Sequence, residues 1–252
     1  MAGHSKFANI KHRKGAQDKK RANLFTKLVR EVVVAAKSGL PDPASNPRLR
    51  LAVANAKSAS VPKDRIEGAI KKATEAGGGE DYEEIRYEGY GTAGVAMIVE
   101  TLSDNKNRTV TDVRTAFAKN GGNLGESGSV IFTFDRLGYM KFNASIGSED
   151  EVLEAAIEAG ADNCESDSDF HEITCAPESL HEVQGFLSEK FGDPESAKLI
   201  WKPNNEIEVD LDKAVSIENL IEKLEDLDDV QDVYSNHSYS DEVAEKLAEN
   251  ID

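Results

Sequence analysis

Apolar side chains recur every three to four residues through the first part of the chain, the spacing that is typical of amphipathic α-helices. A long helix is predicted from Gly15 to Gly39, and one face of it is apolar while cations occupy the opposite face. The apolar stripe consists of Phe25, Leu28, Val29, Val32 and Ala36. Asn46-Pro47 predicts the start of a second helix, because Asn caps helices and Pro suits their first turn. A third helix is expected after Ser60-Val61-Pro62, so the region predicts a small helical bundle.

The pattern changes to strands after the glycine run at 77–79. Alternating or continuous apolar residues, interrupted by one helical pattern, predict strands 84–90, 94–102 and 129–134 and helix 107–120. Residues 138–202 then predict the order strand-helix-strand-strand-helix-strand, the split β-α-β order of a ferredoxin-like unit. The last elements, which lack partners of their own, are strand 206–209, helix 216–227 and strand 230–234. We therefore assign them to the unit that begins at Tyr82.

These elements predict an α+β fold in three domains. An N-terminal three-helix bundle is followed by two ferredoxin-like α/β domains, one of which is inserted in the other. The predicted ranges are 1–77 for a basic helical domain, 80–137 plus 206–238 for a discontinuous middle domain, 138–205 for the inserted domain and 239–252 for an acidic C-terminal tail.

Charge is distributed very unevenly along the chain. The formal net charge is -17, which by itself argues against nucleic-acid binding. Residues 1–75, however, carry 17 Lys and Arg against 6 Asp and Glu, a net charge of +11, and residues 76–252 carry 13 against 41, a net charge of -28. This asymmetry predicts a polyanion-binding surface on the first domain.

Candidate catalytic and metal-binding chemistry is absent from the sequence. The five histidines are scattered, and no Cys or carboxylate stands at metal-ligand spacing from them. Cys164 and Cys175 are expected to be free thiols of a reducing compartment. The glycine-rich stretch 121–129 runs from helix to strand, the reverse of a phosphate-binding loop, so a structural connection or a partner-binding loop is expected there. We predict no enzyme activity, no cofactor and no metal.

The basic lead at residues 4–21 is the strongest functional signal. Lys and Arg displace the counterions of a nucleic acid when they contact its phosphates. Because the lead continues into a helix with a cationic outer face, the predicted nucleic-acid contacts are Lys6, Lys11, His12, Arg13, Lys14, Lys19, Lys20, Lys27 and Arg30. The aromatic ring of Phe7 is expected either to stack on a base or to anchor the lead to the bundle.

At these residues the sequence resembles the YebC/PmpR family, bacterial proteins whose mitochondrial relative is the translational activator of cytochrome c oxidase. The motifs that carry the resemblance are Met1–Lys6, Asn9–Lys14, Leu24–Lys27, Asn46–Arg50, Val61–Asp64, Tyr87–Gly91, Thr101–Thr109 and Gly121–Val130. Two positions depart from the family pattern. Phe7 stands where Trp is usual, and Thr92-Ala93 replaces the usual Pro-Gly.

The resemblance implies a three-domain α/β fold and a cytoplasmic protein without known catalysis or cofactor. Members are described as DNA-binding transcriptional regulators, which is the function we predict. The alternative is a ribosome-associated translational activator that relieves stalls, for example at proline runs, through contacts with ribosomal RNA. The lack of an evident base-reading helix favours RNA or non-specific DNA binding.

The acidic remainder of the chain suggests a further hypothesis, namely that the protein is a scaffold that binds protein partners. The expected partners are therefore DNA or RNA, including ribosomal RNA, together with proteins that bind the acidic domains. A membrane is not an expected partner, because no apolar run approaches the ~20 residues of a membrane span. The sequence leaves the oligomeric state open.

Overall fold

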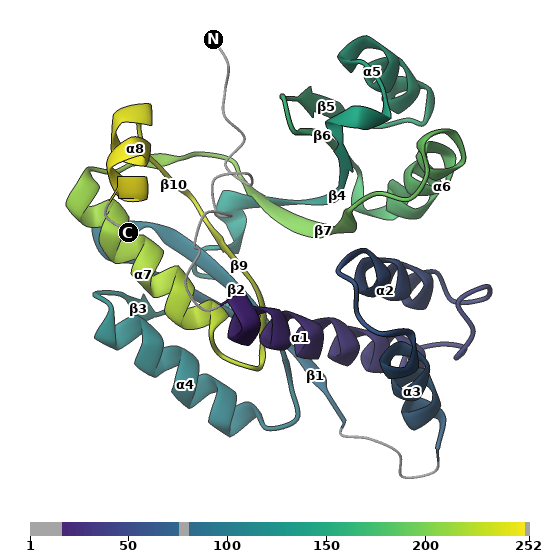
Figure 1. The fold of residues 1–252 in the computed structure, drawn as a ribbon. Helices are drawn as coiled ribbons and strands as arrows, with labels where there is room; N and C mark the ends of the chain where they lie inside the picture. The colour runs from purple at the N-terminus through teal and green to yellow at the C-terminus, as the bar shows by residue number, and fades with distance from the viewer. Residues whose placement is uncertain (1–16, 76–80, 250–252) are drawn as a thin grey trace. The chain divides into compact units, whose positions relative to one another are not determined.

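The computed structural model describes residues 17–75 and 81–249. Within these residues, three helices come first, followed by two four-stranded sheets with covering helices and a short two-stranded pair (Figure 1). The chain therefore has an α+β fold in which a helical N-terminal region leads into β-rich domains. The fold class predicted from the sequence is confirmed.

The N-terminal helices are α1 (Gln17–Lys37), α2 (Pro47–Ser58) and α3 (Lys63–Thr74). Asn46, which is buried, joins the first two. Its side-chain oxygen accepts a hydrogen bond from the backbone N–H of Leu49 (3.1 Å) and caps α2. Its amide nitrogen donates to the carbonyl oxygens of Ala35 (2.8 Å) and Leu40 (2.9 Å), which come from the last turn of α1 and just beyond it.

The first sheet has the strand order β3 (Asn123–Leu124), β1 (Glu83–Tyr90), β2 (Ala96–Ser103) and β9 (Val230–Ser235), and its ladders are antiparallel. Helices α4 (Lys106–Lys119) and α7 (Leu211–Glu225) pack against one face and enclose the fully buried side chains of Met97, Val99, Phe117 and Leu220. Close packing requires a glycine at position 89. A Cβ there would lie 2.7 Å from the carbonyl oxygen of Asn123 and 2.9 Å from the ring of Phe117.

The second sheet has the strand order β5 (Asn163–Ser166), β6 (Phe170–Cys175), β4 (Phe134–Asn143) and β7 (Ser196–Pro203). Strand β6 lies between β4 and β5 and is antiparallel to both, which is the split β-α-β arrangement expected from the sequence. Helices α5 (Glu149–Glu158) and α6 (Leu180–Phe191) cover one face over a core that includes Met140, Ile173 and Leu187.

Asn55 of α2 pairs with the edge strand of this second sheet. Its amide nitrogen donates to the carbonyl oxygen of Ala197 (2.8 Å), and its amide oxygen accepts from the N–H of the same residue (3.1 Å). The side chain thereby satisfies backbone groups that the edge strand β7 would otherwise leave unpaired. Leu51, also on α2, packs against the core beneath α5 and α6.

Some predicted elements were wrong. Residues 129–134 do not form a strand: Ile131–Thr133 is a 3-10 helix, and β4 begins at Phe134. The physical reason is that the side chain of Glu88, instead of a neighbouring strand, binds the backbone N–H groups of Val130 and Ile131. Helix α7 begins five residues before the predicted Ser216, where Asp210 caps it.

The C-terminal segment predicted as an acidic tail contains helix α8 (Asp241–Glu249). Leu247 is buried in the core of the first sheet, and Val243 packs against that core. The apolar positions of this segment lie three to four residues apart, so a helix can bury them while its acidic residues remain outside. Strand β10 (His237–Ser238), just before this helix, forms a short parallel pair with β8 (Ile207–Glu208).

The described residues fall into two compact units. Unit 1 consists of residues 28–75 and 136–200, and unit 2 consists of residues 17–27, 81–135 and 201–249. The pairing of Asn55 with Ala197 lies within unit 1, and the sheet β3-β1-β2-β9 lies within unit 2. The four domain ranges given by the sequence stay a prediction.

Candidate nucleic-acid interface

The predicted phosphate contacts are only partly within the described residues. Lys6, Lys11, His12, Arg13 and Lys14 lie outside them. Lys19 and Lys20 lie in the first turn of α1, but their side chains are outside the described part as well. Lys27 and Arg30 are described, and both are half-buried.

Lys27 lies against the chain's own acidic residues. Its ammonium group donates a hydrogen bond to the carbonyl oxygen of Glu225 at the end of α7 (2.7 Å). Burial lowers the pKa of Lys27 below its ordinary value, while the carboxylates of Glu225, Asp232, Asp226 and Asp228 oppose this effect. In this structure the cation is therefore engaged inside the molecule.

Helix α3 carries exposed cations that contribute to the net charge of residues 1–75 but are not among the phosphate contacts predicted from the sequence. Its exposed cations are Lys63, Arg65, Lys71 and Lys72. Arg65 and Lys72 lie seven residues apart, which places them close together on one side of the helix. Among the described residues, no atom beyond the helix's own backbone and the neighbours of Gly68 lies within 4 Å of where its Cβ would be, so the helix surface there is open. The helical spacing of these cations was the signal that could have found them.

Two of these cations have carboxylate neighbours one turn away. Lys63 lies 3.5 Å from Glu67, and Lys71 lies 4.0 Å from Glu75. The lysine side chains remain 85% and 79% exposed, and ion pairs at such positions contribute little to stability. Both ammonium groups can therefore exchange a carboxylate for a phosphate at small cost.

The arginines of α2 are engaged within unit 1. Arg48 forms an ion pair with Glu31 of α1 (2.9 Å). Arg50 donates from its guanidinium to the carbonyl oxygens of Pro43 (2.9 Å) and Ala44 (3.0 Å). These side chains hold the loop between α1 and α2 and tie α2 to α1.

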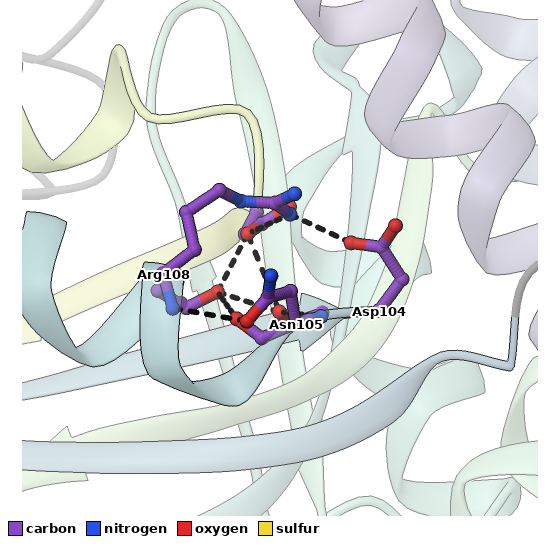
Figure 2. A network of polar contacts seen from close by, with 6 residues as sticks. Asp104, Asn105 and Arg108 are labelled. Carbon is purple, nitrogen blue, oxygen red and sulfur yellow. Dashed lines mark hydrogen bonds and ion pairs between the residues drawn. The ribbon is translucent and has the colours of Figure 1, made fainter.

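A polar network joins the start of α4 to the segment between α7 and β9. Arg108 bridges two carboxylates, Asp104 (2.6 Å) and Asp229 (2.7 Å), and these interactions raise its pKa above the ordinary value. Asp229 is buried and also accepts from the hydroxyl groups of Thr109 (2.6 Å) and Ser103 (3.3 Å). Figure 2 shows Arg108 directed toward Asp104, and the cap residue Asn105 beside them. The network ties two chain-distant loops together with every carboxylate paired, so we assign it a structural role.

A second buried carboxylate organises the glycine-rich stretch. Glu88 accepts hydrogen bonds from the backbone N–H groups of Gly128 (2.8 Å), Val130 (2.8 Å) and Ile131 (2.9 Å). Burial raises the pKa of Glu88, but these three donors and the guanidinium of Arg86 outweigh it, and the pKa lies below the ordinary value. The backbone groups of the loop are thus turned toward the protein, where a carboxylate binds them.

Other kinds of site find no support in the part of the chain that is described. No group of three or more His, Cys, Asp or Glu side chains is placed to hold a metal ion among residues 17–75 and 81–249. Over the same ranges, no helix is both long enough and apolar enough to cross a membrane. Burial raises the pKa of the Cys175 thiol to about 11, so this thiol stays protonated near neutral pH.

These features define a helical, cation-bearing N-terminal region attached to β-rich domains, and this is the organisation of a known family of regulatory proteins. Residues 5–76 match the TACO1/YebC protein N-terminal domain, and residues 82–237 match the TACO1/YebC second and third domain. The chain belongs to the TACO1/YebC family.

Two relatives illustrate the similarity. A probable transcriptional regulatory protein of Zymomonas mobilis, ZMO0153, is 58% identical over 249 residues, which are 99% of this chain and 100% of that protein. The crystal structure of a conserved hypothetical protein of Aquifex aeolicus, Aq1575, matches with a TM-score of 0.84 at 44% identity. That match covers 92% of this chain and 96% of the Aquifex chain.

Proposed function

We propose that the chain is a nucleic-acid-binding regulatory protein, a DNA-binding transcriptional regulator whose N-terminal helices contact phosphates. The observation that carries the proposal is the separation of charge, +11 for residues 1–75 against -28 for the rest. A cationic surface of this kind binds polyanions by releasing their counterions. The name of the Zymomonas relative, a probable transcriptional regulatory protein, supports the regulatory role.

The described cations add detail to this proposal. On α3, Arg65, Lys71 and Lys72 are exposed, and the open surface at Gly68 lets a sugar-phosphate backbone approach the helix. Contacts of this type position a nucleic acid without reading its sequence. We therefore expect binding that depends strongly on salt, with a sequence preference of about tenfold rather than the ~10³–10⁷ of highly specific regulators.

The test is fluorescence anisotropy of the full chain with a 30-base-pair DNA duplex across a range of salt concentrations. With six phosphate contacts, the logarithm of the affinity should fall with the logarithm of the salt concentration with a slope of about -5, at ~0.9 per contact. Replacing five predicted contacts with Glu should abolish binding; these are Lys11, Arg13, Lys14, Lys19 and Lys20.

A matched control changes the charge by the same amount elsewhere. It replaces with Glu five exposed cations of helices α4 and α7, namely Lys106, Arg114, Lys119, Lys213 and Lys223. This variant should lose far less affinity than the N-terminal one. Equal losses, or a salt slope near zero, contradict the proposal. Much tighter binding to a folded RNA with the same number of phosphates would replace the DNA target with the ribosome-associated alternative.

A further inference from the structure

The end of α7 and the segment that leads into β9 form a strongly acidic turn. Residues 225–232, called here the acidic turn, contain five carboxylates and no cation. Asp229 points into the polar network with Arg108 and Thr109. The carboxylates of Glu225, Asp226, Asp228 and Asp232 act on the ammonium group of Lys27.

Helix α1 contacts this turn through two residues that lie one helical turn apart. The ammonium group of Lys27 (2.7 Å) and the amide nitrogen of Asn23 (3.4 Å) both donate to the carbonyl oxygen of Glu225. This carbonyl belongs to the last residue of α7, where the helix dipole places partial negative charge. Both partners lie within unit 2.

The acidic turn offers α1 the same chemistry as a nucleic-acid backbone, namely oxygen acceptors in a field of negative charge. The ammonium group of Lys27 lies in this field, is half-buried and donates to the carbonyl oxygen of Glu225. A phosphate that binds Lys27 therefore competes with the turn for it.

We infer that the acidic turn is an intramolecular competitor that occupies part of the nucleic-acid surface of α1. The inference rests on the proposed function. A nucleic acid gains the contacts of Lys27 only after the turn has released it. Its apparent affinity is therefore its affinity for the released state multiplied by the fraction of molecules in that state. The exposed cations of α3 do not depend on this release and can contact phosphate while the turn still holds Lys27.

The experiment measures nucleic-acid affinity after neutralisation of the two carboxylates of the turn that belong to exposed residues, in the double variant Asp226→Asn/Asp228→Asn. The probe is the 30-base-pair duplex with the full chain. We expect the affinity to rise about three- to tenfold, which corresponds to a contact that holds roughly 70–90% of the molecules closed. The control variant Glu154→Gln/Glu158→Gln removes the same charge from the exposed face of α5 and should change the affinity less than twofold.

A double-mutant cycle with Lys27→Gln separates competition from long-range repulsion. In the wild-type chain, this substitution should have little effect, because Lys27 is occupied by the turn. In the Asp226→Asn/Asp228→Asn background, Lys27 can reach phosphate. Lys27→Gln should therefore lower the affinity several-fold more in this background than in the wild-type chain. The inference is refuted if the α5 control increases affinity equally, or if Lys27→Gln costs the same in both backgrounds. If neither the wild-type chain nor any variant binds the duplex, both the proposed function and the inference that depends on it are refuted.

Discussion

Replacing Glu88 with Gln tests how much of the fold depends on one buried carboxylate. The carboxylate is 4% exposed and binds three backbone N–H groups, so both of its oxygens are used. A Gln side chain keeps one acceptor oxygen, which can serve Val130 and Ile131. Its amide group then faces the N–H of Gly128, and two donors meet without an acceptor between them.

The expected loss follows from these contacts. A hydrogen bond to a charged group contributes about 1.5–3 kcal/mol, and the bond to Gly128 is lost outright. The other two bonds become neutral and weaken by roughly half, which adds about 1.5–3 kcal/mol for the two together. We expect the free energy of unfolding to fall by about 3–6 kcal/mol and the melting temperature to fall by roughly 6–24 °C, at ~2–4 °C for each kcal/mol.

Urea denaturation and hydrogen exchange provide the assay. The backbone amides of Gly128, Val130 and Ile131 should exchange faster in the Glu88→Gln variant, while those of the second sheet should not change. Glu126→Gln is the matched control, because Glu126 is exposed on the same loop and its loss should cost less than ~0.5 kcal/mol. A loss below about 1 kcal/mol for Glu88→Gln, or unchanged exchange of the three amides, would refute the reasoning.

The pH dependence gives an independent check. The folded-state pKa of Glu88 lies below the ordinary value of 4.5, because backbone donors stabilise the charged form. Its contribution to stability is therefore fully present above that ordinary value and is lost as the pH falls through the lower folded-state pKa. The stability difference between wild type and Glu88→Gln should be constant near neutral pH and should shrink in acid.

Two further substitutions test other parts of the fold by urea denaturation. Asp229→Asn should cost about 2–4 kcal/mol, because it removes the buried charge that pairs with Arg108 and weakens the bonds from two hydroxyl donors, for which a single neutral acceptor oxygen remains. Asp104→Asn, at a side chain that is 30% exposed, should cost less than ~1 kcal/mol, and equal losses would contradict the assignment. Leu247→Ala should cost about 2–4 kcal/mol if α8 belongs to the core, whereas a solvated tail would show no change.

Much of the secondary structure was predictable because its causes are local. The cap at Asn46, the proline after it and the apolar spacing within α3 act over a few residues, so the sequence shows them directly. The order of the second sheet was predictable for a related reason: a helix between two strands that share a sheet leaves few ways to connect them. The cationic character of the N-terminal region follows from composition alone.

Tertiary structure decided how individual charged groups are used. Lys27 and Glu225 are 198 residues apart in the chain, and Arg108 and Asp229 are 121 apart, so no local pattern reveals their pairing. Val130 and Ile131 have the β-branched character of a strand, yet the carboxylate of Glu88 binds their backbone N–H groups instead. By itself, the sequence determined that the N-terminal helices carry an excess of cations. Which cations remain open depends on where the folded chain brings its own acceptors, because one carbonyl or carboxylate at hydrogen-bond distance is enough to engage a cation.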